Sequence, residues 1–197
     1  MSSLASKVFA VSGGASGMGL AICRMLAAAK VKAISIDDFQ DANFDAIRKG
    51  LQSINPSTEV RTVKVDVSSS ASVTAWISGI ILSFGTLDGA VNAAGMAQPV
   101  GLRKSPAILS ETDEMFKRMV GINLEGVFYC SKEQIRIMME LPKASRSIVN
   151  ITSIASPVHG GDICMVMVCR RLAWRICRRV WQRMLHRMGL GSIGFTW

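Results

Sequence analysis

Histidine, tyrosine and long apolar runs are all scarce in this chain of 197 residues. The two histidines, His159 and His186, are isolated, and the five cysteines lack the spacing of metal ligands, so we expect no metal site. The odd cysteine count fits a reducing compartment better than a disulfide framework, and we expect a cytoplasmic protein. Because no apolar run reaches about 18 residues, and no charged N-terminus precedes an apolar stretch, we expect neither a membrane partner nor a secretory signal.

Acidic residues are absent after Asp162, and the net charge of +9 is concentrated there. The arginines of this region are Arg170, Arg171, Arg175, Arg178, Arg179, Arg183 and Arg187. Three of the four tryptophans also lie beyond residue 163. Since the rest of the chain is nearly neutral, the overall charge does not predict a nucleic-acid partner. Composition instead divides the chain into one domain, residues 1–162, and an atypical basic segment, residues 163–197.

A strand, a glycine-rich turn and a helix are predicted in succession between residues 8 and 29. Residues 8–11 are apolar, four glycines lie between positions 13 and 19, and apolar residues then recur at helical spacing. Glycines leave room for a phosphate, and the N–H groups at a helix N-terminus carry a partial positive charge. This succession is typical of the start of a nucleotide-binding βαβ unit.

Strands and helices continue to alternate after this unit. The expected strands are residues 32–36, 60–67, 87–92 and 146–152, and the expected helices are residues 44–54, 70–84 and 110–139. Alternation at crossover length predicts an α/β fold, a Rossmann-like, doubly wound parallel sheet. Asp37 ends the second strand about 20 residues after the glycines, where a carboxylate would bind a ribose hydroxyl and repel a 2′-phosphate. It therefore favours NAD over NADP; the alternative is a solvated aspartate at a strand end.

Six motifs, in order over residues 5–162, together resemble the short-chain dehydrogenase/reductase family. The sequence SGGASGMG that begins at Ser12 is similar to the family's T-G-x-x-x-G-x-G, and NAAG at Asn92 matches its N-A-G. Asn123 in INLEGVF and Ser153 in IVNITS match its helix asparagine and its catalytic serine. The resemblance implies an oxidoreductase that transfers a hydride between NAD(H) and a secondary alcohol or ketone.

The resemblance also assigns site residues and an oligomeric tendency. It implies that Asn123 and Ser153 are catalytic and that Asp66 contacts adenine. The cofactor-binding residues that we expect are Ser12, Gly13, Ser16, Gly17, Met18, Gly19, Asp37, Asp66, Val67, Asn92, Ala93, Ala94 and Gly95. Family members are usually homo-oligomers and continue beyond residue 162, so we expect a C-terminally truncated domain with an incomplete interface. The strand at 146–152 would then be an exposed sheet edge, and we expect poor solubility or a disordered tail.

The tyrosine and lysine of the family are missing from their expected places. They should lie 13 and 17 residues after Ser153, where this chain has Val166 and Arg170. Its one tyrosine, Tyr129, falls inside a predicted helix, and no lysine follows Lys143. Valine cannot carry a proton and a guanidinium hardly titrates, so the resemblance implies an impaired enzyme.

A shift of reading frame near residues 157–164 explains both the missing pair and the basic segment. Regrouping the possible codons from Cys164 onward permits tyrosine at position 166 and lysine at position 170. The same frame permits G-I-R-V-N at positions 188–192, as the family has after this helix. The alternative is a basic amphipathic helix that binds acidic grooves or membrane surfaces. The chain would then be a non-catalytic nucleotide-binding remnant or an interaction protein that acts through its basic tail.

Overall fold

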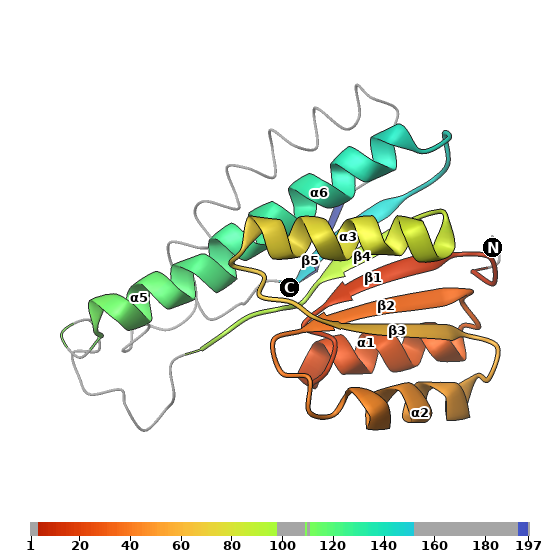
Figure 1. The fold of residues 1–197 in the computed structure, drawn as a ribbon, viewed down its shortest axis with the longest axis horizontal. Helices are drawn as coiled ribbons and strands as arrows, with labels where there is room; N and C mark the ends of the chain where they lie inside the picture. Colours follow the sequence, from red (N-terminus) through yellow and green to blue (C-terminus); the bar gives the residue numbers. More distant parts are fainter. Residues whose placement is uncertain (1–3, 98–108, 110, 152–192, 197) are drawn as a thin grey trace.

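The computed structural model describes residues 4–97, 109, 111–151 and 193–196 (Figure 1). Within this part of the chain, parallel strands form one sheet in the order β3-β2-β1-β4-β5-β6. The strands are β1 (Val8–Ser12), β2 (Ala33–Asp38), β3 (Glu59–Lys64), β4 (Gly89–Asn92), β5 (Ser147–Ile151) and β6 (Ile193–Thr196). The strand order reverses direction between β1 and β4, which is the topological switch point of a doubly wound sheet. The prediction of a Rossmann-like parallel sheet is confirmed.

Helices cover both faces of this sheet (Figure 1). The helices α1 (Gly17–Ala28) and α2 (Phe44–Ile54) lie on one face, and α3 (Ser70–Phe84) and α6 (Gly126–Glu140) lie on the other. Strand β1 contributes side chains to the cores on both faces of the sheet. Val8 and Ala10 pack with residues of α3 and α6, whereas Val11 packs with residues of α1 and α2. No helix of the described residues is long and apolar enough to cross a membrane.

The long helix predicted over residues 110–139 is interrupted in the structure. It consists of α5 (Asp113–Val120), the π-helical turn η2 (Gly121–Glu125) and α6. Gly126 lies where the chain re-enters α6, and a Cβ at this position would be 2.8 Å from the Cγ2 atom of Val67. The wider turn therefore brings the helix backbone close to the loop that follows β3. Asn123, a predicted site residue, lies within this π-helical turn.

Two predicted strands differ from the observed ones. The strand predicted over residues 60–67 ends at Lys64, so Asp66 and Val67 belong to the following loop. The prediction that the strand at 146–152 is a sheet edge is wrong, because β6 pairs with β5 in parallel, with Ile148 opposite Ile193. Ser153, Val166 and Arg170 lie outside the described residues, and the division of the chain after residue 162 stays a prediction.

Candidate functional site

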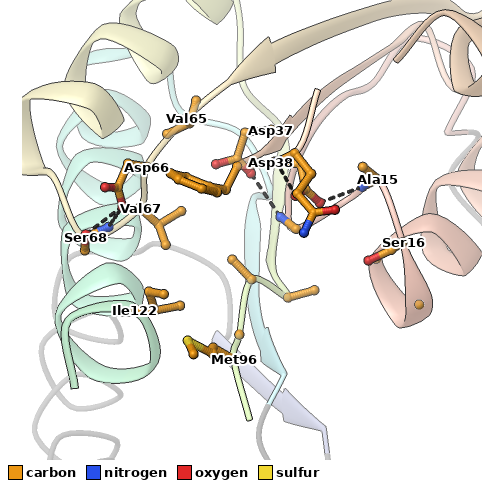
Figure 2. A pocket seen from close by; sticks show the side chains of 18 of the residues that line it. Ala15, Ser16, Asp37, Asp38, Val65, Asp66, Val67, Ser68, Met96 and Ile122 are labelled. Carbon is orange, nitrogen blue, oxygen red and sulfur yellow. Dashed lines mark hydrogen bonds between the residues drawn. The ribbon is translucent and has the colours of Figure 1, made fainter. Parts of the chain in front are cut away.

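A cavity of about 990 Å³ lies at the carboxyl ends of β1, β2, β3 and β4 (Figure 2). Its walls are the glycine turn after β1, residues 37–40 and 42–43 at the end of β2 and beyond it, residues 65–68 after β3, residues 93–96 after β4, and parts of α5 and η2. Small-molecule and cofactor sites usually have volumes of about 300–1,000 Å³. The location beside the switch point of the strand order is where open α/β sheets bind ligands.

The cavity brings together most of the predicted cofactor-binding residues. Those that line it are Gly13, Ser16, Gly17, Met18, Gly19, Asp37, Asp66, Val67, Ala93, Ala94 and Gly95. Ser12 and Asn92 do not line the cavity and are almost fully buried beneath it. The Oγ atom of Ser12 accepts hydrogen bonds from the backbone N–H groups of Ala93 and Ala94, each at 3.2 Å. Ser12 thus supports the loop after β4, which forms the cavity floor.

The glycine turn is tightly packed against its neighbours. Gly13 has a φ of +65°, and a Cβ at this position would lie 2.6 Å from the Cα atom of Ala94. A Cβ on Gly19 would collide with the carbonyl oxygen of Gly13. The turn thereby delivers the N-terminus of α1 to the cavity, with Ser16, Gly17 and Met18 on its wall. Helix N-termini with free N–H groups are favourable places for a phosphate.

The carboxyl end of β2 holds the glycine turn in place. The Gly13 N–H group donates to Oδ1 of Asp37 at 3.1 Å, and the Gly14 N–H group donates to the Asp37 carbonyl oxygen at 3.0 Å. The Ala15 N–H group donates to Oδ2 of Asp38, also at 3.1 Å (Figure 2). Both carboxylates therefore lie on the cavity wall, between the turn and the loop after β2.

Asp37 is fully buried and one of its oxygens lacks a partner. Its Oδ2 atom accepts no hydrogen bond in the described part of the chain. Burial raises the pKa of this carboxyl well above its usual range, an effect that the Gly13 N–H group opposes and the charge of Asp38 increases. A buried acceptor without a donor is costly, and Asp37 is among the residues that line the cavity. A ligand hydroxyl that donates to Oδ2 would remove that cost, so the residues present fit a ribose.

The side chain of Asn123 forms hydrogen bonds with the protein backbone. Its Oδ1 atom accepts from the Met96 N–H group at 2.9 Å, and its Nδ2 atom donates to the Met96 carbonyl oxygen at 2.8 Å. The side chain is 1% exposed. This paired contact ties the π-helical turn to the loop after β4, on which Met96 lines the cavity. The side chain of Asn123 therefore positions the cavity wall.

Comparison with known proteins agrees with this geometry. The family model for short chain dehydrogenases matches residues 7–165. The chain belongs to the short-chain dehydrogenase family. Chanoclavine-I dehydrogenase of Aspergillus fumigatus is 48% identical over 163 residues, which cover 83% of this chain and 62% of that protein. The chain therefore spans about three fifths of the length of this relative.

Solved structures of other proteins share the fold. A short-chain dehydrogenase/reductase from Sinorhizobium meliloti superposes with a TM-score of 0.78 at 25% identity, over 97% of this chain and 78% of that chain. The NADH-dependent reductase A1-R′ in complex with NAD has a TM-score of 0.80 at 18% identity, over 98% and 80% of the two chains. A metagenomic oxidoreductase in complex with NADP has a TM-score of 0.82 at 18% identity, over 98% and 82%. The family uses NAD or NADP.

A buried polar cluster beneath the cavity was not predicted from the sequence. The Nδ2 atom of Asn92 donates to Oδ1 of Asn150 at 2.7 Å and to Oε1 of Gln134 at 3.1 Å, and the Nε2 atom of Gln134 donates back to Oδ1 of Asn92 at 2.8 Å. Ser131 joins the same cluster at 3.2 Å from Asn92. Ser131 and Gln134 lie three positions apart on the buried face of α6, which was a readable signal. The cluster fixes α6 to the carboxyl ends of β4 and β5.

The structure also adds cavity residues that the motifs did not indicate. Asp38, Phe39 and Gln40 follow Asp37 on the same wall, and Lys117 and Arg118 reach the cavity from α5. The three after Asp37 could have been inferred, because residues that follow a parallel strand face the ligand side of the sheet. Within the described residues no group of histidine, cysteine and acidic side chains could hold a metal ion.

The variant in which asparagine replaces Asp37 (D37N) should gain stability relative to the wild type as the pH rises, when both are free of ligand. Because burial raises the pKa of Asp37 above the usual value of 3.8, the folded state binds more protons than the unfolded state at pH values above 3.8. The wild-type free energy of unfolding should therefore fall with rising pH in this window, and D37N should lack that part of the fall. Urea unfolding between about pH 5 and pH 8 measures it. Equal pH slopes for D37N and wild type would contradict the expectation.

Proposed function

We propose that the cavity binds NAD(H), and that this chain has lost most of the hydride transfer that its family performs on a small-molecule alcohol or ketone. The observation that supports the first part is the buried carboxyl of Asp37, a residue that lines the cavity and whose Oδ2 atom has no hydrogen-bond partner among the described residues. When bound, a nicotinamide ring would accept or supply the hydride. The second part rests on Val166 and Arg170, which occupy the places of the family's tyrosine and lysine.

Three parts of the cavity would hold three parts of NAD(H). Asp37 would accept hydrogen bonds from the adenosine ribose, and the first turn of α1 would face the pyrophosphate. Asp66 and Val67 lie on the wall that the family resemblance assigns to adenine. A carboxylate that faces the ribose favours a free 2′-hydroxyl group over a 2′-phosphate, and NAD(H) is therefore preferred over NADP(H).

The substrate that we propose is a small molecule with a secondary alcohol or a ketone. The relative from Aspergillus fumigatus is named for the oxidation of chanoclavine-I, so this compound belongs first in a substrate panel. We infer no nucleic-acid or membrane partner, because the charge of residues 1–162 is nearly balanced. We place the protein in the cytoplasm, which agrees with the free, buried thiols of Cys23 and Cys130.

Titration with NADH tests the cofactor proposal directly. The full-length chain should bind NADH with a Kd below about 1 mM, which corresponds to about −4.1 kcal/mol. Replacement of Asp37 by alanine (D37A) should weaken binding by at least about tenfold, because the ribose hydroxyl groups lose their acceptor and a buried donor without a partner costs about 1–3 kcal/mol. Fluorescence or calorimetric titration measures both affinities.

The matched control is Asp45→Ala, which removes an exposed carboxylate of α2 outside the cavity. It should bind NADH as the wild type does. Absence of NADH binding at millimolar concentration by the folded wild-type chain would overturn the proposed function.

A further inference from the structure

We propose that Lys117 and Arg118 of α5 steer the anionic cofactor into the cavity and so determine how fast it binds. This inference rests on the proposed binding of NAD(H). It assigns to the two side chains an effect on the association rate, which requires no contact with the bound cofactor.

The charged residues of the cavity wall are divided by sign. Lys117 and Arg118 are the cationic residues among the described ones that line the cavity, and both are exposed. The acidic residues that line it are Asp37, Asp38, Asp66 and Glu125. Without the two cations of α5, the charged side chains of the described wall would all be acids, and they would oppose the entry of an anionic ligand.

The two cations lie on the outer part of the cavity. Lys117 is one helical turn before Gly121, and a Cβ on Gly121 would be 3.4 Å from the Cβ atom of Ser68. The helix therefore passes beside the loop after β3 at Gly121, and Lys117 lies further out on the same side. Figure 1 shows α5 extending past the carboxyl ends of the strands, away from α1 and α2. A ligand that approaches these strand ends from solvent meets the charges of α5 before it reaches the glycine turn.

A structural role within α5 does not account for the two cations. In the described part of the chain, no ion pair joins either of them to Asp113 or Glu114, the acids one helical turn before them. Their charges do not stabilise a helix end either, because the backbone stays helical at Gly121 and α5 continues into η2. Both charges are therefore available to act on a ligand.

An effect on association follows from the range over which charges interact. The partial positive charge at the N-terminus of α1 falls off within about one helical turn, so it acts on a pyrophosphate that has already arrived. Full charges act over about 8 Å at physiological ionic strength and over about 30 Å at 0.01 M. A cleft lined by cations raises the local concentration and the association rate of an anion. Lys117 and Arg118 should therefore change the rate at which NADH enters more than the rate at which it leaves.

The test measures the association and dissociation rates of NADH by stopped-flow fluorescence, for the full-length chain and its double variant Lys117→Gln/Arg118→Gln. At an ionic strength of about 0.01 M, the variant should bind NADH at least about fivefold more slowly than the wild type and release it at a rate within about twofold. At about 1 M the Debye length falls to about 3 Å, and the two association rates should then agree within about twofold.

Two control variants separate steering from other effects of the substitutions. The double variant Arg24→Gln/Lys49→Gln removes one arginine and one lysine from exposed positions of α1 and α2 that do not line the cavity. The exchange Lys117→Arg/Arg118→Lys keeps both charges on α5. Each control should bind NADH at a rate within about twofold of the wild type. The single glutamine variants should have intermediate rates, and they replace the double variant if thermal unfolding shows that it does not fold.

Slower association that disappears at high salt, and that both controls lack, supports the proposal. An unchanged association rate overturns it, as does an equal slowing in Arg24→Gln/Lys49→Gln, because net charge alone would then matter. Slowing that persists at about 1 M also overturns it, since the substitutions would then have altered the cavity itself. Faster dissociation as the main effect overturns it because the two side chains would then hold the bound cofactor. A folded wild-type chain that binds no NADH overturns the proposed function, and the proposed steering with it.

Discussion

The chain translated in the alternative reading frame from about residue 160 should oxidise NADH in the presence of ketones at least about a hundredfold faster than the present chain. The alternative frame permits tyrosine at position 166 and lysine at position 170. A positioned general acid contributes about 10²–10⁴-fold to such a rate, and a neighbouring cation lowers the pKa of a tyrosine toward neutrality. The loss of NADH absorbance with a panel of ketones measures the rate of reduction. The gain of NADH absorbance with NAD and chanoclavine-I measures the rate of oxidation.

The control for this experiment is the frame-restored chain with valine retained at position 166. It should fold, bind NADH and remain as slow as the present chain. Turnover by the present chain at the rate of the restored one would contradict the argument from the missing tyrosine. The coding DNA over residues 155–197 tests the frame shift independently. If the frame has shifted, this DNA must contain a tyrosine codon and a lysine codon in the alternative frame.

Replacement of Gly19 by alanine (G19A) should destabilise the domain by about 2–4 kcal/mol and abolish measurable NADH binding. The added Cβ would collide with the Gly13 carbonyl oxygen, and Gly13 cannot retreat because it packs on Ala94. Inserting a carbon into a closely packed region typically costs about 1–3 kcal/mol, more where the backbone must shift. Urea unfolding followed by circular dichroism measures the stability, and fluorescence titration measures the NADH affinity.

Gly50 provides the matched control for this substitution. It is an exposed residue of α2, and a Cβ there would have nothing within 4 Å. Gly50→Ala should therefore stabilise the chain by about 0.5–1 kcal/mol, because alanine loses less backbone freedom than glycine in a helix. Equal stability changes for the two glycines would show that Gly19 is not under steric constraint.

The sheet and the glycine turn were predictable because their signals are local. Short apolar segments, the glycine spacing and the acid after the second strand each follow from a few adjacent residues. The π-helical turn at Asn123 was not predictable, since one extra residue per turn leaves almost no trace in an apolar pattern with a period of 3.6. The pairing of β6 with β5 was missed for another reason: it joins segments more than 40 residues apart in the chain.

The residues of the site also divide into those with a local sequence signal and those without one. Asp37 could be assigned from its distance to the glycines, whereas Asp38 would face the opposite side of an ideal strand. The strand ends at Asp38, and its side chain is free to turn toward the Ala15 N–H group. The cluster of Asn92, Gln134 and Asn150 depends on three elements meeting in space. Its partners could not be paired before the fold was known.

The hydroxyl of Ser12 gives the cavity a mechanical property. It lies at the start of the glycine turn and accepts from the N–H groups of Ala93 and Ala94, while Gly13 packs on Ala94. The two loops on opposite sides of the switch point are thus joined by the Ser12 hydroxyl and by the Ser12 carbonyl oxygen, which accepts from the Ala93 N–H group at 3.1 Å. Their amides should exchange with solvent deuterium as one cooperative unit, and a ligand that orders one loop should protect the other equally.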